Sequence, residues 1–168
     1  MDIDQIQEDV GVSLPSSYLQ YLARLSGASE PSVRKELRCG DRLWRMASQG
    51  ELLETITVHD AGEKPFHSCL ELFLSLHLKF TGQRKVRSSL GNLPKERVLQ
   101  GFVIGSDNGD YLYLDKADDY SVWAFCHDGC DVEKLNSSFQ HILNANAVRL
   151  DDDKKAPATR RKWWKFWN

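Results

Sequence analysis

The chain has 168 residues, of which 41% are hydrophobic and 27% charged, so it fits one domain with its own core and needs no disulfide framework. The net charge of −2 is uneven: residues 1–150 hold 16 Lys and Arg against 21 Asp and Glu, which makes the body mildly acidic. No apolar run approaches a membrane span, and the acidic start is unlike a secretory signal, so we expect a cytoplasmic protein with reduced cysteines.

Two amphipathic helices are predicted at the start of the chain. The first ends at Gly11, and the second begins at Pro15, whose missing N–H is harmless in a first turn, and closes at Ser26-Gly27. Their apolar stripes are Ile3, Ile6 and Val10 in the first helix, and Tyr18, Leu19, Leu22 and Leu25 in the second.

The middle of the chain is less regular. Cys39–Trp44 is predicted as a short strand, and Met46–Leu53 as a short helix or a second strand. The alternation of side-chain types over residues 54–58 favours a strand there. Residues 59–67, with Gly62 and Pro65, are predicted as a loop. A helix is then predicted from Phe66 or Leu70 through Phe80, with Leu70, Phe73, Leu74, His77 and Leu78 on one face.

A β-hairpin over Gly101–Asp115 is the strongest local prediction. Residues 102–104 and 111–114 are strand formers, and residues 105–110 supply the turn, in which Asn108-Gly109 tolerates the positive φ that tight reversed turns require. The alternation of two tyrosines with two leucines predicts one face on the core and one face carrying phenolic edges.

The rest of the folded body is predicted as a strand and a closing helix. Ser121–Cys126 forms the strand, between turns at Lys116–Tyr120 and Asp128-Gly129, and Val132 and Leu135 lead into the helix. That helix buries Phe139, Ile142 and Leu143 and is capped by Ser137 or Asn136. Helices at both chain ends around a central, mostly antiparallel sheet give an α+β fold class.

Beyond residue 150 the composition changes. Residues 151–159 are predicted to be a solvated linker with no capacity to fold, and residues 160–168 are a basic tail with three tryptophans, Trp163, Trp164 and Trp167. Such a tail suits contact with a membrane surface or with a protein partner. A third interpretation is that it folds back over the sheet and buries its rings.

Patterns for catalysis or metal binding are weak. Ser106 lacks the spacing of a hydrolase elbow, and Asp107, Asn108 and Asp110 are not arranged as a calcium loop. A zinc site from Cys126 and Cys130 would need Cys39 and Cys69 and has no Cys-x-x-Cys pair, so a free, buried Cys126 is favoured. We therefore predict no catalytic residue, no metal, no cofactor and no enzymatic activity.

Seven acidic residues fall at turns beside the central strands: Asp107, Asp110, Asp115, Asp118, Asp119, Asp128 and Asp131. An acidic body argues against nucleic-acid binding and suits the covering of a basic surface. Turns are also commonly acidic and solvated. The sequence leaves both interpretations open.

The hairpin residues 102–115, followed by Val122-Trp123, resemble the SUKH superfamily, the Smi/Knr-type domains. Further motifs in the same order are the opening helix, Leu14-Pro15 with Tyr18, Gly40–Trp44 and the closing Ser138-Phe139 helix. The resemblance implies a SUKH-like domain over residues 1–150, with residues 60–95 as a variable insert, followed by the linker and tail of residues 151–168.

The resemblance also implies a function. Bacterial SUKH proteins are non-enzymatic immunity proteins that bind and neutralise a cognate polymorphic toxin in interbacterial competition, and a nuclease is one candidate toxin. The alternative is a scaffold or regulatory module that docks on a protein partner or membrane surface through its tail. The residues expected to contact the partner are Trp44, Asp107, Asn108, Asp110, Asp118, Asp119 and Tyr120, with Trp163, Trp164 and Trp167 as tail contacts.

Overall fold

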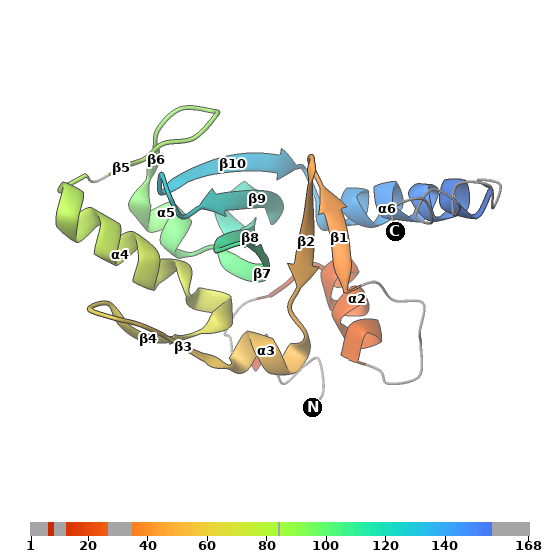
Figure 1. Ribbon diagram of the computed structural model, residues 1–168, viewed down its shortest axis with the longest axis horizontal. Coiled ribbons are helices and arrows are strands. Elements are labelled where there is room, and N and C mark those ends of the chain that lie inside the picture. Colours follow the sequence, from red (N-terminus) through yellow and green to blue (C-terminus); the bar gives the residue numbers. More distant parts are fainter. Residues whose placement is uncertain (1–6, 9–12, 27–34, 84, 156–168) are drawn as a thin grey trace, which may run out of the picture.

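The protein is built on one six-stranded antiparallel sheet, seen in a computed structural model that describes residues 7–8, 13–26, 35–83 and 85–155 (Figure 1). The strand order is β1-β2-β7-β8-β9-β10. The strands are β1 (Glu36–Cys39), β2 (Arg42–Met46), β7 (Phe102–Asp107), β8 (Asp110–Asp115), β9 (Ser121–Cys126) and β10 (Asp131–Asn136). The predicted α+β class is confirmed.

Helices and two small hairpins surround this sheet. The helices are α2 (Ser16–Ser26), α3 (Gln49–Leu53), α4 (Leu70–Thr81), α5 (Lys95–Leu99) and α6 (Phe139–Lys155), with 3-10 turns η1 (Phe66–Ser68) and η2 (Lys116–Asp118). The hairpins pair β3 (Thr55–Val58) with β4 (Gly62–Pro65) and β5 (Lys85–Val86) with β6 (Leu93–Pro94). Figure 1 places α4 at one end of the molecule and α2 and α6 near β1. None of the described helices has the length and apolar character that crossing a membrane would require.

The central strands are buried on both faces. Tyr113 and Trp123 are fully buried, and Tyr111 is half-buried against the rings of Phe66 and Phe73 at centroid distances of 6.0 and 5.1 Å. The prediction that one face of the hairpin carries exposed phenolic edges is therefore wrong, because η1 and α4 cover that end of β8. The pattern of two tyrosines and two leucines is typical of a half-exposed strand, but here both sides pack.

The hairpin itself is confirmed with a shorter turn. Its strands extend to Asp107 and Asp110, and only Asn108 (φ 49°) and Gly109 (φ 88°) form the reversal, as a type I′ turn requires. Gly105 lies inside β7, where a Cβ would come within 2.7 Å of the carbonyl oxygen of Arg45. A glycine at this position therefore permits β2 to approach β7.

Three predicted boundaries are wrong. Residues 39–44 form no single strand, because the chain reverses at Gly40-Asp41 between β1 and β2. The predicted loop at residues 59–67 contains β4 and the start of η1, and the predicted lead-in to the last helix is strand β10. In β4 and β10 the pairing partner, β3 or β9, supplies the order that the local sequence does not indicate.

The ends of the chain are partly described. The second helix is confirmed as α2, whereas the first predicted helix lies outside the described residues apart from helical residues 7–8. Helix α6 is capped by Ser138, whose hydroxyl accepts the His141 N–H at 3.3 Å, and not by either predicted residue. It continues to Lys155, so residues 151–155 are helical where a linker was predicted, and residues 156–168, including the tail tryptophans, lie outside the described residues.

Both edges of the sheet are engaged by other parts of the chain. At β10, Ser88 forms a parallel bridge with Val132, whose N–H donates to the carbonyl of Arg87 at 2.9 Å. At β1, the side-chain amide of Asn146 accepts the N–H of Arg38 and donates to its carbonyl, both at 2.9 Å. The buried amide of α6 thus takes the place of a neighbouring strand.

Candidate functional site

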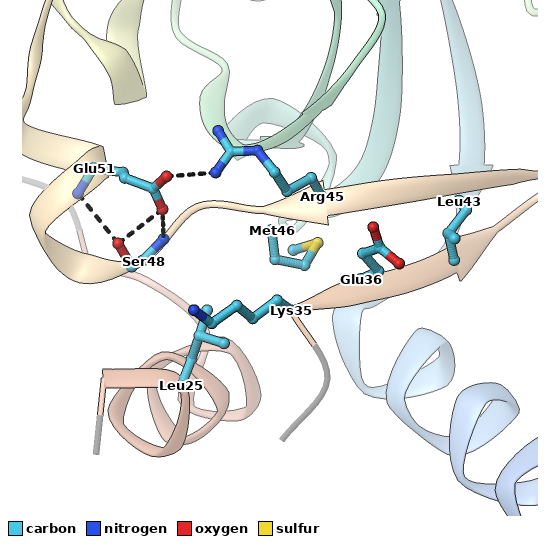
Figure 2. A pocket seen from close by; sticks show the side chains of 8 residues that line it. All are labelled: Leu25, Lys35, Glu36, Leu43, Arg45, Met46, Ser48 and Glu51. Carbon is cyan, nitrogen blue, oxygen red and sulfur yellow. Dashed lines mark hydrogen bonds and ion pairs between the residues drawn. The ribbon is translucent and has the colours of Figure 1, made fainter. Parts of the chain in front are cut away.

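A groove of about 730 Å³, the α2–α3 groove, lies between α2, the β1–β2 hairpin and α3 (Figure 2). Its lining combines three apolar side chains with two charges of each sign and a hydroxyl: Leu25, Leu43, Met46, Lys35, Arg45, Glu36, Glu51 and Ser48. Strand pleating exposes Leu43 and Arg45 of β2 and buries Trp44 and Met46. A concave surface of this kind can receive an apolar anchor from another protein.

One wall of the groove is fixed by a capping box at the start of α3. The Ser48 hydroxyl accepts the N–H of Glu51 at 3.4 Å, and the Glu51 carboxylate accepts the Ser48 N–H at 2.8 Å and pairs with Arg45. Burial opposes ionisation of Glu51, but these partners outweigh it and lower its pKa from 4.5 to about 2. Glu51 is therefore a fixed negative charge, already paired within the chain.

This arrangement predicts a pH dependence of stability. The folded pKa of Glu51 lies below its ordinary value, so its contribution is present above about pH 4.5 and is lost as the pH falls toward 2. With the side chain 31% exposed, we expect about 1 kcal/mol after solvent screening. Urea unfolding of Glu51→Gln should show a smaller loss over this window than the parent protein. Glu133→Gln, at an exposed position, is the control, and equal pH slopes for both variants would contradict the prediction.

At one end of the sheet lies the hairpin-tip cluster, which consists of Arg42, Asp107, Asp110 and His127. The guanidinium donates to Asp107 from Nε and Nη2 at 3.0 and 2.8 Å, and to Asp110 from Nη1 at 2.6 Å. The other Asp110 oxygen accepts the His127 N–H at 2.9 Å and lies 2.7 Å from its ring Nδ1. Burial works against the ionised form of Asp110, but these bonds lower its pKa. The cluster ties β2 to the turns after β7 and β9.

At the opposite end of β8 lies the Asp115 cluster of Arg97, Asp115, Asp118 and Lys134. Asp115 is 1% exposed and accepts two bonds from Arg97, from Nε and Nη2, both at 2.7 Å. Asp118 pairs with Lys134 at 2.5 Å, and this ion pair, ahead of its bond from Ser121, lowers the pKa of Asp118. The cluster holds the connection between β8 and β9.

The residues predicted to contact a partner do not form one patch. Asp107, Asn108 and Asp110 lie at one end of β8, and Asp118, Asp119 and Tyr120 lie beyond the other. Among them only Asn108 and Asp119 are exposed, while the remaining four are half-buried. One binding surface cannot centre on both groups.

Trp44 is not on the surface at all. Its side chain is 0% exposed, its Nε1 donates to the carbonyl of Cys39 at 3.2 Å, and the Arg42 guanidinium lies 4.5 Å from its ring centroid. The prediction of Trp44 as a direct partner contact is corrected, because its ring is part of the core and supports Arg42.

The acidic residues at the turns fit neither interpretation of the sequence, which were a surface that covers a basic partner and a set of solvated turns. Asp107, Asp110, Asp115 and Asp118 are paired with Arg42, Arg97 or Lys134 inside the chain, so they are neither free charges for a basic partner nor merely solvated. Asp128 is 93% exposed and lies 3.0 Å from Nε2 of the neighbouring His127 ring. The negative charge at these four positions is therefore largely neutralised within the chain.

The cysteines are four separate free thiols. Cys126 is half-buried, a correction to its predicted burial, whereas Cys39, Cys69 and Cys130 are buried. Burial raises the pKa of Cys39 to about 11 and that of Cys69 to about 12, so both are protonated near neutral pH and poor nucleophiles. Within the described ranges, no group of three or more His, Cys, Asp or Glu is placed to hold a metal ion.

The α2–α3 groove was not predicted from the sequence. The Ser48-x-x-Glu51 spacing was a readable signal for its wall, since it is a capping-box pattern. Its other residues come together only through the β1–β2 reversal, at a place where the sequence predicts one strand.

Comparison with known proteins gives one match. The family described as SMI1 / KNR4 family (SUKH-1) matches residues 1–145. Neither the curated proteins nor the solved structures include a match. The matched span includes residues 60–95, whose status as a variable insert stays a prediction.

Proposed function

This chain belongs to the SMI1 / KNR4 family (SUKH-1), and from that premise we propose that it is a non-enzymatic immunity protein that binds and neutralises a cognate polymorphic toxin. Family membership carries the proposal, because the immunity-protein role is a general property of this family. The toxin would come from a contact-dependent or secreted interbacterial system, and a nuclease is one candidate.

The proposed mechanism is occlusion of the toxin by a rigid surface. The folded body offers fixed, paired charges and buried aromatic supports, which hold the exposed loops in one geometry before binding. Preorganisation of this kind lowers the entropic cost of association. Asn108 and Asp119 are the exposed members of the predicted contacts and remain candidates for direct contact.

Co-expression with the product of the adjacent upstream gene tests the proposal. We expect this protein to restore growth of cells that produce the toxin and to co-purify with it as a stable complex. A toxic neighbour that is neither bound nor neutralised would contradict immunity for that pair.

The competing function is a scaffold that docks through its tail. Its specific support is the last nine residues, which hold three of the five tryptophans and four Lys or Arg. A chain that ends after Lys155 keeps α6 whole and removes the tail. Full protection by this truncated chain agrees with immunity, whereas loss of partner binding or cellular location on truncation alone favours the scaffold.

A further inference from the structure

The ladder of the β3–β4 hairpin shows which backbone groups of β3 face outward. Just before β3 begins, Phe66 donates its N–H to the carbonyl of Glu54 at 2.8 Å. Hydrogen-bonded and non-hydrogen-bonded pairs alternate along an antiparallel ladder, so the backbone groups of Ile56 also face β4. The backbone groups of Thr55 and Thr57, which lie between these positions, therefore face away from the hairpin.

Pro65 supports this assignment independently. It lies opposite Thr55 in the register and has no N–H, so these two residues cannot exchange both bonds of a hydrogen-bonded pair. Thr55 and Thr57 are exposed, and among the residues that the structure describes no hydrogen bond reaches the outward backbone groups of either one. Their N–H groups and carbonyls form an open strand edge along β3.

Other strand edges of the molecule are engaged. β4 lies against α4, where Lys64 pairs with Glu71 at 2.8 Å, and the edges of the six-stranded sheet are met by Asn146 and by the backbone at Ser88. Figure 1 places the β3–β4 hairpin at the margin of the molecule, beneath α4. β3 has the sequence TITV, in which every side chain is β-branched and favours a strand. An open edge of this kind is a template for another extended backbone.

We propose that a second copy of this chain occupies this edge, with the two β3 strands antiparallel about a two-fold axis at Ile56. The axis places Thr55 of each copy opposite Thr57 of the other, so every outward N–H of one strand meets an outward carbonyl of its partner. The two hairpins would join into one sheet of order β4-β3-β3-β4. A wider sheet is more stable than a separate two-stranded hairpin, which is marginal in water.

The side chains of β3 argue for a second copy as the occupant, because this register is complementary to itself. Ile56 would meet its own copy, and Glu54 would lie opposite Val58, so no like charges face each other. A shift of the axis by one residue toward the turn would bring Glu54 opposite Asp60. A shift the other way would bring the end of α3 opposite Thr57, where no strand is available.

Sedimentation velocity of the purified full chain over a wide range of concentration tests the pairing, and we expect a reversible monomer–dimer equilibrium. Thr57→Pro removes an outward N–H but no bond within the hairpin, and proline is tolerated at such edge positions. It should raise the dimer Kd by about tenfold or more. Thr57→Val keeps the N–H and the β-branched shape, so this matched control should dimerise within about twofold of the parent chain.

Charge variants test the register. Thr55→Lys/Thr57→Lys and Thr55→Glu/Thr57→Glu each place like charges opposite each other in the proposed dimer, so each variant alone should stay monomeric. An equal mixture of the two variants should dimerise, because opposite charges then face each other at both positions. Thermal unfolding checks that every variant is folded, and the mixture decides the question even if Thr57→Pro does not fold.

The outcomes are independent of immunity, because the test needs no toxin. A parent chain that stays monomeric up to its solubility limit overturns the proposal. A dimer that Thr57→Pro and the charge variants leave unchanged lies on another surface and overturns it as well. A monomeric chain whose toxin binding is weakened by Thr57→Pro would assign the β3 edge to an extended segment of the toxin, which also overturns the second copy.

Discussion

Replacement of Asp115 by alanine is expected to lower the free energy of unfolding by about 3–5 kcal/mol, because it leaves a partly buried guanidinium without its partner. Asp115 is 1% exposed, and one of its oxygens accepts both bonds from Arg97. Its other oxygen accepts the N–H of Ala117 at 2.9 Å and so caps η2. Removal of the carboxylate therefore disturbs both the ion pair and the connection to β9.

Urea unfolding measures this effect, and two further variants interpret it. Asp128→Ala removes a carboxylate that is 93% exposed and should change stability by about 0.5 kcal/mol or less. The double replacement Arg97→Met/Asp115→Leu should recover much of the loss, because apolar side chains of similar volume can replace a buried ion pair. A loss below about 1 kcal/mol for Asp115→Ala would mean that water reaches the pair.

Replacement of Trp44 by alanine should cost about 3–5 kcal/mol, as expected for removal of a fully buried tryptophan. The ring fills the core face of β2, and Arg42 lies over it on the way to Asp107 and Asp110. Loss of the ring should therefore also loosen the hairpin-tip cluster. A tryptophan that only contacted a partner would lower affinity on replacement and leave stability unchanged.

Trp44→Phe is the control for this prediction. It keeps most of the packing and removes the Nε1 donor to Cys39, so a loss of about 1–2 kcal/mol is expected. The measurement is the midpoint and slope of urea unfolding, followed by toxin binding at a concentration where every variant is folded. Unchanged stability of Trp44→Ala together with lost toxin binding would restore Trp44 as a contact residue.

Local chemistry explains which elements the sequence predicted. Asn108-Gly109 specifies its own turn, and the apolar spacing after Pro15 specifies α2, so both could be predicted without the rest of the chain. By contrast, β10 has no strong strand pattern of its own and is ordered by its pairing with β9. The reversal at Gly40-Asp41 was missed because the residues on both sides of it suit a strand.

The candidate surfaces were harder to predict because they depend on long-range pairs. Arg42 reaches Asp107 and Asp110 across more than sixty residues of sequence, and these contacts decide whether an acidic residue is a free charge or half of an ion pair. The amino-acid composition does not distinguish a free acidic residue from one that is in an ion pair. The basic segment at residues 79–97 can be seen in the sequence, but the pairing of Arg97 with Asp115 within it is a property of the fold.

The two edges of the six-stranded sheet have a consequence for the behaviour of the protein at high concentration. Concentrated protein favours strand-to-strand polymerisation wherever the edge of a sheet is open. Here the Asn146 amide at Arg38 and the backbone at Ser88 meet those edges. A strand added at either edge would first have to displace the Asn146 side chain or the backbone at Ser88.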